Sequence, residues 1–193
     1  MRTTLSNLRG KLDRLKVADR GLRVFGAGGV DGHGYRELPC LDEASIGHLE
    51  SSLQVRLPDE LRAFLETVHG GGPGPGYGLF VDAPAAPTAR AARPFPYGDD
   101  DAASLITRQG VERLAGLPLA EGDHDDDWPP GPGFVALAHH GCGCFDVLVV
   151  TGEQRGLVWF CDMQWFPRFA EHGQLGFLDW YESWLDHALT AKT

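Results

Sequence analysis

Three short apolar runs between residues 134 and 161 predict the centre of the fold. Each has the length of a β-strand, is rich in β-branched and aromatic residues, and is bounded by glycine: Phe134–Ala138, Cys144–Val150 and Leu157–Cys161. Connections of about five residues suit antiparallel hairpins better than crossovers. The second run is apolar on both faces, which is typical of a central strand that is covered on both sides.

The pattern near the end of the chain predicts an amphipathic helix that covers one face of this sheet. Apolar residues recur at intervals of three and four from Phe177 to Leu189, and they include Trp180, Tyr181 and Trp184. Each aromatic side chain of this size can bury roughly 150–250 Å². We therefore expect this helix to be a core element, without which the domain would unfold.

Two further helices are predicted before the strands, and each has a clear start. Asp42 or Ser45 can cap the first. Pro58 opens the second, with acidic residues in its first turn, and Gly70 stops it. Glycine and proline then fill most of residues 70–78, which cannot form regular structure and lead to a short predicted strand at 79–81.

The pattern is weaker between residues 83 and 133. Alanine and proline over residues 83–96 predict a surface excursion, which the run Pro94-Phe95-Pro96-Tyr97 would pin to the body. Residues 104–117 show a modest helical pattern, and residues 123–133 are acidic and then rich in proline and glycine, as in a surface loop.

The first 34 residues are predicted to form an extension of the main domain, which spans residues 35–190. Leucines at positions 5, 8, 12 and 15 fall on one face of a helix of about four turns. Five glycines within residues 26–34 predict a flexible link. We expect the helix to lie across the domain or a neighbouring copy. A membrane-surface helix is less favoured, because the stripe contains no aromatic residue.

Charge is distributed unevenly along the chain. The 193 residues carry a formal net charge of −10, yet residues 1–36 hold eight Lys/Arg against three Asp/Glu, whereas residues 97–133 hold two against nine. An acidic protein is a poor nucleic-acid ligand, because neutralising phosphates requires a cationic face. The acidic stretch instead suits a basic protein partner.

The sequence gives no sign of export or of a membrane span. No apolar run approaches the roughly 20 residues that cross a bilayer, and the N-terminal segment lacks a leader pattern. Four cysteines in a chain of 193 residues do not form a disulfide framework. We therefore expect reduced thiols in a cytoplasmic protein that does not bind membranes.

His139, His140, Cys142 and Cys144 raise the possibility of a zinc site or a Cys/His hydrolase. The Cys-x-Cys spacing is unfavourable for zinc, because structural sites usually separate their cysteines by about two to four residues. The favoured interpretation is a tight glycine turn with two small buried thiols. No Gly-x-Ser-x-Gly, P-loop or His-Glu-x-x-His motif occurs. We predict no catalytic residue, no metal and no cofactor.

Two acidic runs are the main candidates for contacting a partner. The second run, at residues 123–127, could chelate calcium, but it lacks the glycine and terminal glutamate of the twelve-residue calcium loop. A solvated loop that faces a basic partner is favoured, with Trp128 and Tyr77 as aromatic anchors. The acidic candidates are Asp99, Asp100, Asp101, Asp123, Asp125, Asp126 and Asp127.

Several motifs in order resemble the SUKH superfamily of cell-wall-assembly-regulator-like proteins and bacterial immunity proteins. The resemblance covers roughly Tyr35 to Leu189. Its segments are Leu49–Glu50, Val55–Leu65, Gly70–Phe80, Ala92–Pro96, His140–Cys144 leading to Leu148–Gly152, Gly156–Trp159 and Phe177–Leu185. The residues that serve as structural motifs are Pro58, Gly72, Gly78, Gly141, Cys142, Gly143, Trp159, Trp180 and Trp184.

The resemblance implies a single α+β domain, in which helices pack a mostly antiparallel sheet, and it implies no catalysis. Bacterial members of the superfamily commonly bind and neutralise toxins, many of them nucleases, and fungal members are regulatory interaction proteins. We therefore expect an immunity-type protein that binds a basic toxin domain, as a monomer or weak homodimer. The alternative is a regulatory or scaffold module that docks through residues 1–24.

Overall fold

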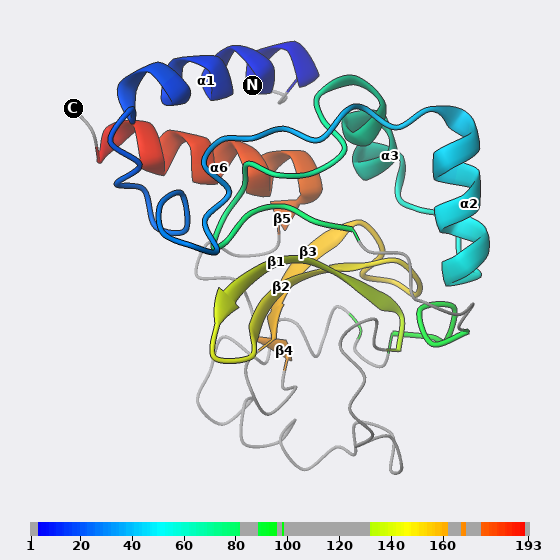
Figure 1. Cartoon of the computed structure of the whole chain (residues 1–193). Coiled ribbons are helices and arrows are strands. Elements are labelled where there is room, and N and C mark those ends of the chain that lie inside the picture. Colours follow the sequence, from blue (N-terminus) through cyan, green and yellow to red (C-terminus); the bar gives the residue numbers. More distant parts are fainter. Residues whose placement is uncertain are drawn as a thin grey trace.

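The computed structural model describes residues 4–81, 89–95, 98, 132–161, 167–168 and 175–191. These residues form a single α+β domain (Figure 1). Its elements are α1 (Leu5–Ala18), α2 (Glu43–Leu53), α3 (Asp59–Thr67), β1 (Phe134–Gly141), β2 (Cys144–Val149), β3 (Leu157–Cys161), β4 (Pro167–Arg168), β5 (Leu175–Gly176) and α6 (Phe177–Thr190).

The three predicted strands and their antiparallel pairing are confirmed. The strand order is β1-β2-β3-β4, and β5 also pairs with β3. β1 and β2 pair from Phe134 opposite Val149 to Gly141 opposite Cys144, with a register shift between Ala136 and Ala138. A second shift lies between His139 and Gly141, and β1 runs past its predicted end at Ala138 as far as the turn into β2.

Both faces of β2 are buried, as its apolar sequence predicts. Val147 and Val149 pack with Trp159 and with Phe95 on one face of the sheet. Leu148 belongs to the larger cluster on the other face, where α1, α3 and α6 lie (Figure 1). Of the run predicted to pin the chain to the body, residues 94 and 95 are described, and the Phe95 ring lies 5.1 Å from that of Trp159.

α1 lies side by side with α6 on the helical face of the sheet (Figure 1). Three leucines of its predicted stripe are completely buried: Leu8, Leu12 and Leu15. Asn7 donates to Glu182 over 2.6 Å, and Lys11 donates to Asp186 over 2.7 Å, so the two helices run parallel. The stripe therefore packs against α6 of the same chain.

Residues 19–35 fold into turns that are fixed to the end of α1. The buried carboxylate of Asp19 accepts hydrogen bonds from the backbone N–H groups of Arg23 and Val24 and from the Tyr35 hydroxyl, over 2.8–2.9 Å. Further along, His33 N–H donates to the Gly26 carbonyl over 3.0 Å. The division of the chain into an extension and a domain at residue 34 stays a prediction.

Two of the predicted element boundaries need correction. Asp42 caps α2, as one of the two alternatives has it, but Pro58 is the N-cap of α3 and not its first helical residue. α3 ends at Thr67, before Gly70. The strand predicted at 79–81 is wrong, since Leu79 forms only isolated bridges, to Gly72 and to Ala138. The predictions for 104–117 and for most of 83–96 and 123–133 lie outside the described residues.

Candidate functional site

The loop of residues 70–78 is largely inside the molecule, and Tyr77 is its one exposed residue, at 38%. The loop fits this position because glycine lets backbone approach backbone. A Cβ on Gly76 would lie 2.2 Å from the His139 carbonyl oxygen, and one on Gly74 would lie 2.6 Å from the Leu79 nitrogen. Glycine and proline therefore build a packed support that presents Tyr77 at the surface.

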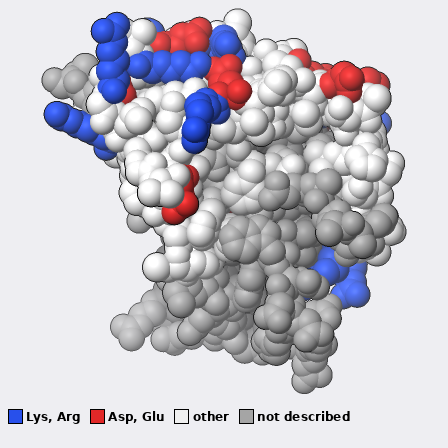
Figure 2. Space-filling view, viewed as in Figure 1, with Lys and Arg blue, Asp and Glu red and all other residues white. Residues whose placement is uncertain are grey.

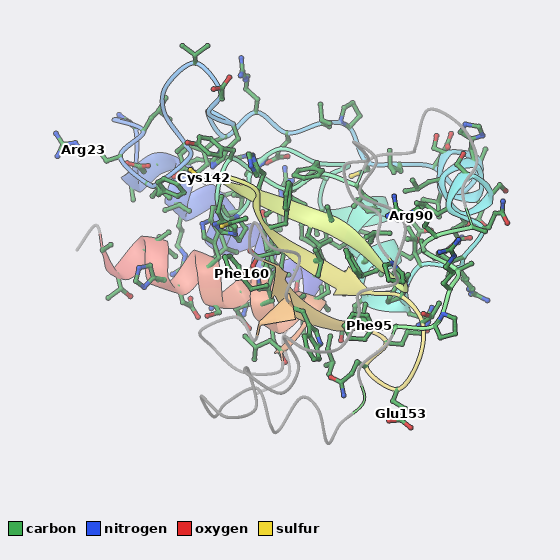
Figure 3. All side chains as sticks on the ribbon, turned by 90° about the horizontal axis from the view of Figure 1, so that it is seen from below. Arg23, Arg90, Phe95, Cys142, Glu153 and Phe160 are labelled. Carbon is green, nitrogen blue, oxygen red and sulfur yellow. The ribbon has the colours of Figure 1, made fainter. Side chains whose placement is uncertain are left out.

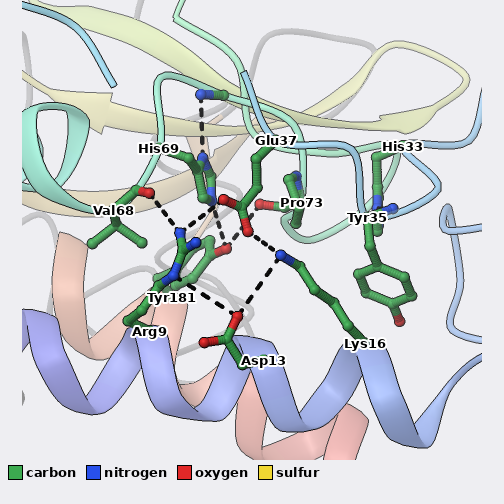
Figure 4. A network of polar contacts seen from close by, with 11 residues as sticks. Arg9, Asp13, Lys16, His33, Tyr35, Glu37, Val68, His69, Pro73 and Tyr181 are labelled. Carbon is green, nitrogen blue, oxygen red and sulfur yellow. Dashed lines mark hydrogen bonds and ion pairs between the residues drawn. The ribbon is translucent and has the colours of Figure 1, made fainter. Parts of the chain in front are cut away.

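A buried histidine and tyrosine hold the start of this loop (Figure 4). The Tyr181 hydroxyl donates to the Pro73 carbonyl over 2.9 Å, so it accepts from Nε2–H of His69, 3.0 Å away. Nδ1 of His69 in turn accepts from the Gly71 N–H over 3.2 Å. Burial lowers the pKa of His69 to about 4, which keeps the ring neutral and both its nitrogens in these roles.

In the same network, charged side chains of α1 bind Glu37 and the backbone just after α3 (Figure 4). Arg9 donates to Glu37 over 2.7 Å and to the Val68 carbonyl over 2.8 Å, and Lys16 also pairs with Glu37. Burial alone would raise the pKa of Glu37, but the hydrogen bonds from Lys16 and Arg9 outweigh it and hold that pKa below its ordinary value. Glu37 therefore stays ionised between two cations.

The turn between β1 and β2 lies beside Tyr77. Its two central residues, Cys142 and Gly143, have φ of +51° and +73°, which is the signature of a type I′ hairpin turn. The predicted tight glycine turn is thus present, but the prediction of two buried thiols is wrong: Cys142 is exposed and Cys144 is half-buried. Cys142 is the first residue of the two-residue turn, beyond the last paired residues of β1 and β2, so neither strand covers its side chain.

The histidines of this turn do not meet the cysteines in a metal site. His140 Nε2 lies 2.7 Å from Asp146 Oδ2. Within the part of the chain that the structure describes, no three His, Cys, Asp or Glu side chains are grouped so as to hold a metal ion. Over the same residues, no helix combines the length and the apolarity that crossing a membrane would need.

An aromatic patch forms where Tyr77 meets the turn that follows α1. We define this patch as Phe25, Tyr77 and His139. Phe25 is 61% exposed, and its ring lies 5.6 Å from that of Tyr77. The His139 ring lies 5.9 Å from the Tyr77 ring and stacks, at 4.8 Å, on the ring of the buried Phe145. The patch thus connects the surface to the sheet through successive ring contacts.

Sequence reasoning identified Tyr77 as a candidate anchor and missed Phe25. The glycines around Phe25 indicated a link, and its contact with Tyr77 depends on a residue that is far away in the sequence. The available signal was a large aromatic residue within a glycine-rich stretch. The other predicted contact residues lie outside the described part of the chain: Asp99, Asp100, Asp101, Asp123, Asp125, Asp126, Asp127 and Trp128.

The residues predicted as structural motifs occupy positions that explain their identity. Gly72 and Gly78 have φ of +111° and +118°, and a Cβ on either would lie within 2.3 Å of a backbone oxygen. Gly141, at φ +89°, precedes the hairpin turn and lies under the Tyr77 ring. Trp159 and Trp180 are buried, on opposite faces of the sheet, and Trp184 is half-buried on α6.

A model of the SMI1 / KNR4 family (SUKH-1) matches residues 40–181. The chain belongs to this family. The SUKH-1 match contains α2, α3, the Tyr77 loop and the whole sheet, but it excludes α1 and the turn that carries Phe25. No curated protein and no solved structure matches the chain.

Proposed function

We propose that this SUKH-1 protein is a non-enzymatic protein-binding domain of the immunity type, which binds a bacterial toxin and neutralises it by covering its working surface. The presentation of Tyr77 carries the proposal. A buried loop of glycine and proline holds one tyrosine at the surface beside a second exposed aromatic residue. Rigid aromatic side chains of this kind supply most of the binding energy at protein interfaces.

The acidic runs at 99–101 and 123–127 complete the proposal. Their carboxylates would meet the cationic groove of a toxin that acts on nucleic acid, and Trp128 would add a second anchor. Charges at the rim of an interface mainly accelerate association and make it dependent on salt. Replacing the four aspartates of the second run with asparagine should therefore slow association at low salt, as measured by stopped flow.

The proposal is tested by capturing the partner from the native cell with the wild-type protein as bait, and then titrating the purified partner. Tyr77→Ala should weaken binding by about tenfold or more, or at least about 1.4 kcal/mol. Leu38→Ala is the matched control, because Leu38 is 59% exposed on a different segment and should leave affinity unchanged.

Cells that make the captured partner should survive only when they also make the wild-type protein. A partner that is harmless to cells would contradict the immunity role and favour the alternative, a regulatory module for a housekeeping protein. That alternative was expected to dock through residues 1–24. The leucines that would have served it are buried against α6, so docking there would have to use the polar face of α1.

A further inference from the structure

The turn after α1 exposes apolar side chains in a way that core packing does not require. Leu22 is 39% exposed, Phe25 is 61% exposed and Val30 is 99% exposed. They lie within nine residues of sequence, whereas single exposed apolar residues scattered over a surface need no explanation. Phe25 also contacts the ring of Tyr77, which is itself 38% exposed, so these two rings form one contiguous apolar surface of the kind that marks an interaction site.

This turn is held in place by the fold. Asp19 accepts the N–H groups of Arg23 and Val24 at its start. At its centre, a Cβ on Gly26 would lie only 1.6 Å from the Gly76 carbonyl oxygen, so the backbone of the turn rests directly on the Tyr77 loop. Phe25 and Tyr77 therefore present a single preformed surface, which binds without a large cost in conformational entropy.

The charges around this surface are mainly positive. Arg20, Arg23 and Arg36 are exposed on the turn and its flanks, where Asp31 is the one exposed acid. Arg23 extends away from the body, at the same end of the molecule as Cys142 (Figure 3). Within the described residues, no carboxylate pairs with Arg20 or Arg23, and Arg36 donates to the Gly32 carbonyl over 3.4 Å. Over α1 itself, Lys and Arg are interspersed with acidic side chains (Figure 2), and Arg9, Lys11 and Lys16 pair with carboxylates there.

We propose that Phe25 and Tyr77 form the centre of a docking surface for an apolar segment of a protein partner that is flanked by Asp or Glu. The aromatic rings would cover the apolar side chains, and Arg20 and Arg23 would pair with the flanking carboxylates. This inference rests on the proposed protein-binding function. It assigns the patch to a part of the partner that differs from the cationic groove expected to meet the acidic runs.

Charge favours an acidic peptide segment over nucleic acid as the occupant. Specific nucleic-acid binding needs many phosphate contacts, whereas the turn offers three arginines on a chain of net charge −10. The surface also combines a residue from the family domain with a residue from the N-terminal segment that precedes it. Tyr77 lies inside the range matched by the family, and Phe25 lies outside it. The N-terminal segment would thus set which partner this SUKH-1 protein selects.

Selection from a displayed library of random peptides on the intact protein tests the chemistry directly. Wild-type protein should enrich peptides that carry aromatic or branched apolar residues flanked by Asp and Glu. The Phe25→Ala, Arg23→Glu double variant should lose this class, and an enriched peptide should bind it about tenfold or more weakly in fluorescence anisotropy. Leu38→Ala should keep both the class and the affinity.

Three outcomes overturn the inference: no enriched class, enrichment of Lys- and Arg-rich peptides, or equal enrichment on the double variant. Preferential binding of single-stranded DNA, lost in the same variant, would also overturn it. An unchanged melting temperature shows that the double variant is folded. A captured toxin that binds the double variant normally would refute this inference and leave the proposed function standing, whereas a partner that is harmless would refute the function alone.

Discussion

Gly76 occupies a position where a side chain has no room. Its φ is +57°, and a Cβ would lie 2.2 Å from the carbonyl oxygen of His139. We predict that Gly76→Ala lowers the free energy of unfolding by about 1–3 kcal/mol, because the loop must move away from β1. Urea denaturation measures the change. Gly10→Ala is the control: nothing lies within 4 Å of that site, so the same change should stabilise α1 by about 0.5–1 kcal/mol.

Cys142 stands where a hairpin turn prefers asparagine or glycine. Its φ of +51° costs energy for a residue with an ordinary side chain. Cys142→Asn should therefore raise the urea midpoint, by an amount equivalent to about 0.5–1 kcal/mol. Cys40→Asn, at another exposed cysteine, should leave the midpoint in place. A lower midpoint for Cys142→Asn would mean that the thiol makes contacts which outweigh the backbone strain.

At the scale of whole elements, the contribution of α1 packing to the stability of the domain can be measured. Leu12 is completely buried in the cluster that α1 shares with α6. Leu12→Ala should cost about 2–5 kcal/mol of unfolding free energy and should lower a single cooperative transition. Val17→Ala, on the exposed face of the same helix at 64% exposure, should change stability by about 0.5 kcal/mol or less. A Leu12→Ala protein that unfolds like wild type would make α1 a detachable appendage.

Elements were predictable from the sequence where local pattern and tertiary role agree. β2 is apolar at nearly every position because both its faces are covered, and α6 shows helical spacing because it packs along one side. The turn at 19–35 was not predictable in the same way. Its conformation depends on the buried Asp19 carboxylate and on the contact between Gly26 and Gly76, which lie on different parts of the chain. A high glycine content by itself predicts a flexible segment, but in this turn glycine instead allows two backbone segments to pack closely.

The residues of the candidate site also differ in whether the sequence alone could identify them. Tyr77 was predictable because a single aromatic residue within a glycine and proline loop has few structural reasons to be there. Phe25 was not, since its role comes from a ring contact with Tyr77 that only the folded chain creates. The arginines near Phe25 were visible as a basic N-terminal segment, but the sequence did not place them next to the anchor.

For the molecule as a whole, two buried histidines predict a loss of stability in acid. Burial lowers the pKa of both His33 and His69 to about 4, against 6.5 in the unfolded chain. Nε2 of His33 is buried with no hydrogen-bond partner among the described residues. As pH falls from 6.5 towards 4, the unfolded chain takes up protons that the folded chain refuses. Each histidine then removes up to about 1.4 kcal/mol of stability per pH unit.

Urea titrations between pH 7.5 and 4.5 check this slope, because both histidines contribute fully to stability only above pH 6.5. His69→Gln should reduce the slope, even if the variant is less stable overall. His48→Gln, on the exposed side of α2, should leave the slope as it is. A stability that rises as pH falls through this range would show that the buried rings are charged.

The pairing of α1 with α6 has a consequence for synthesis. Asn7 and Glu182, which join the two helices, are 175 residues apart. A ribosome therefore releases the leucine face of α1 long before the helix that shields it exists. Through most of translation the leucines of α1 cannot be buried in their native contacts. The domain can complete its fold only when α6 has emerged from the ribosome. Nascent chains of this protein should bind general chaperones through the segment that forms α1, Leu5–Ala18.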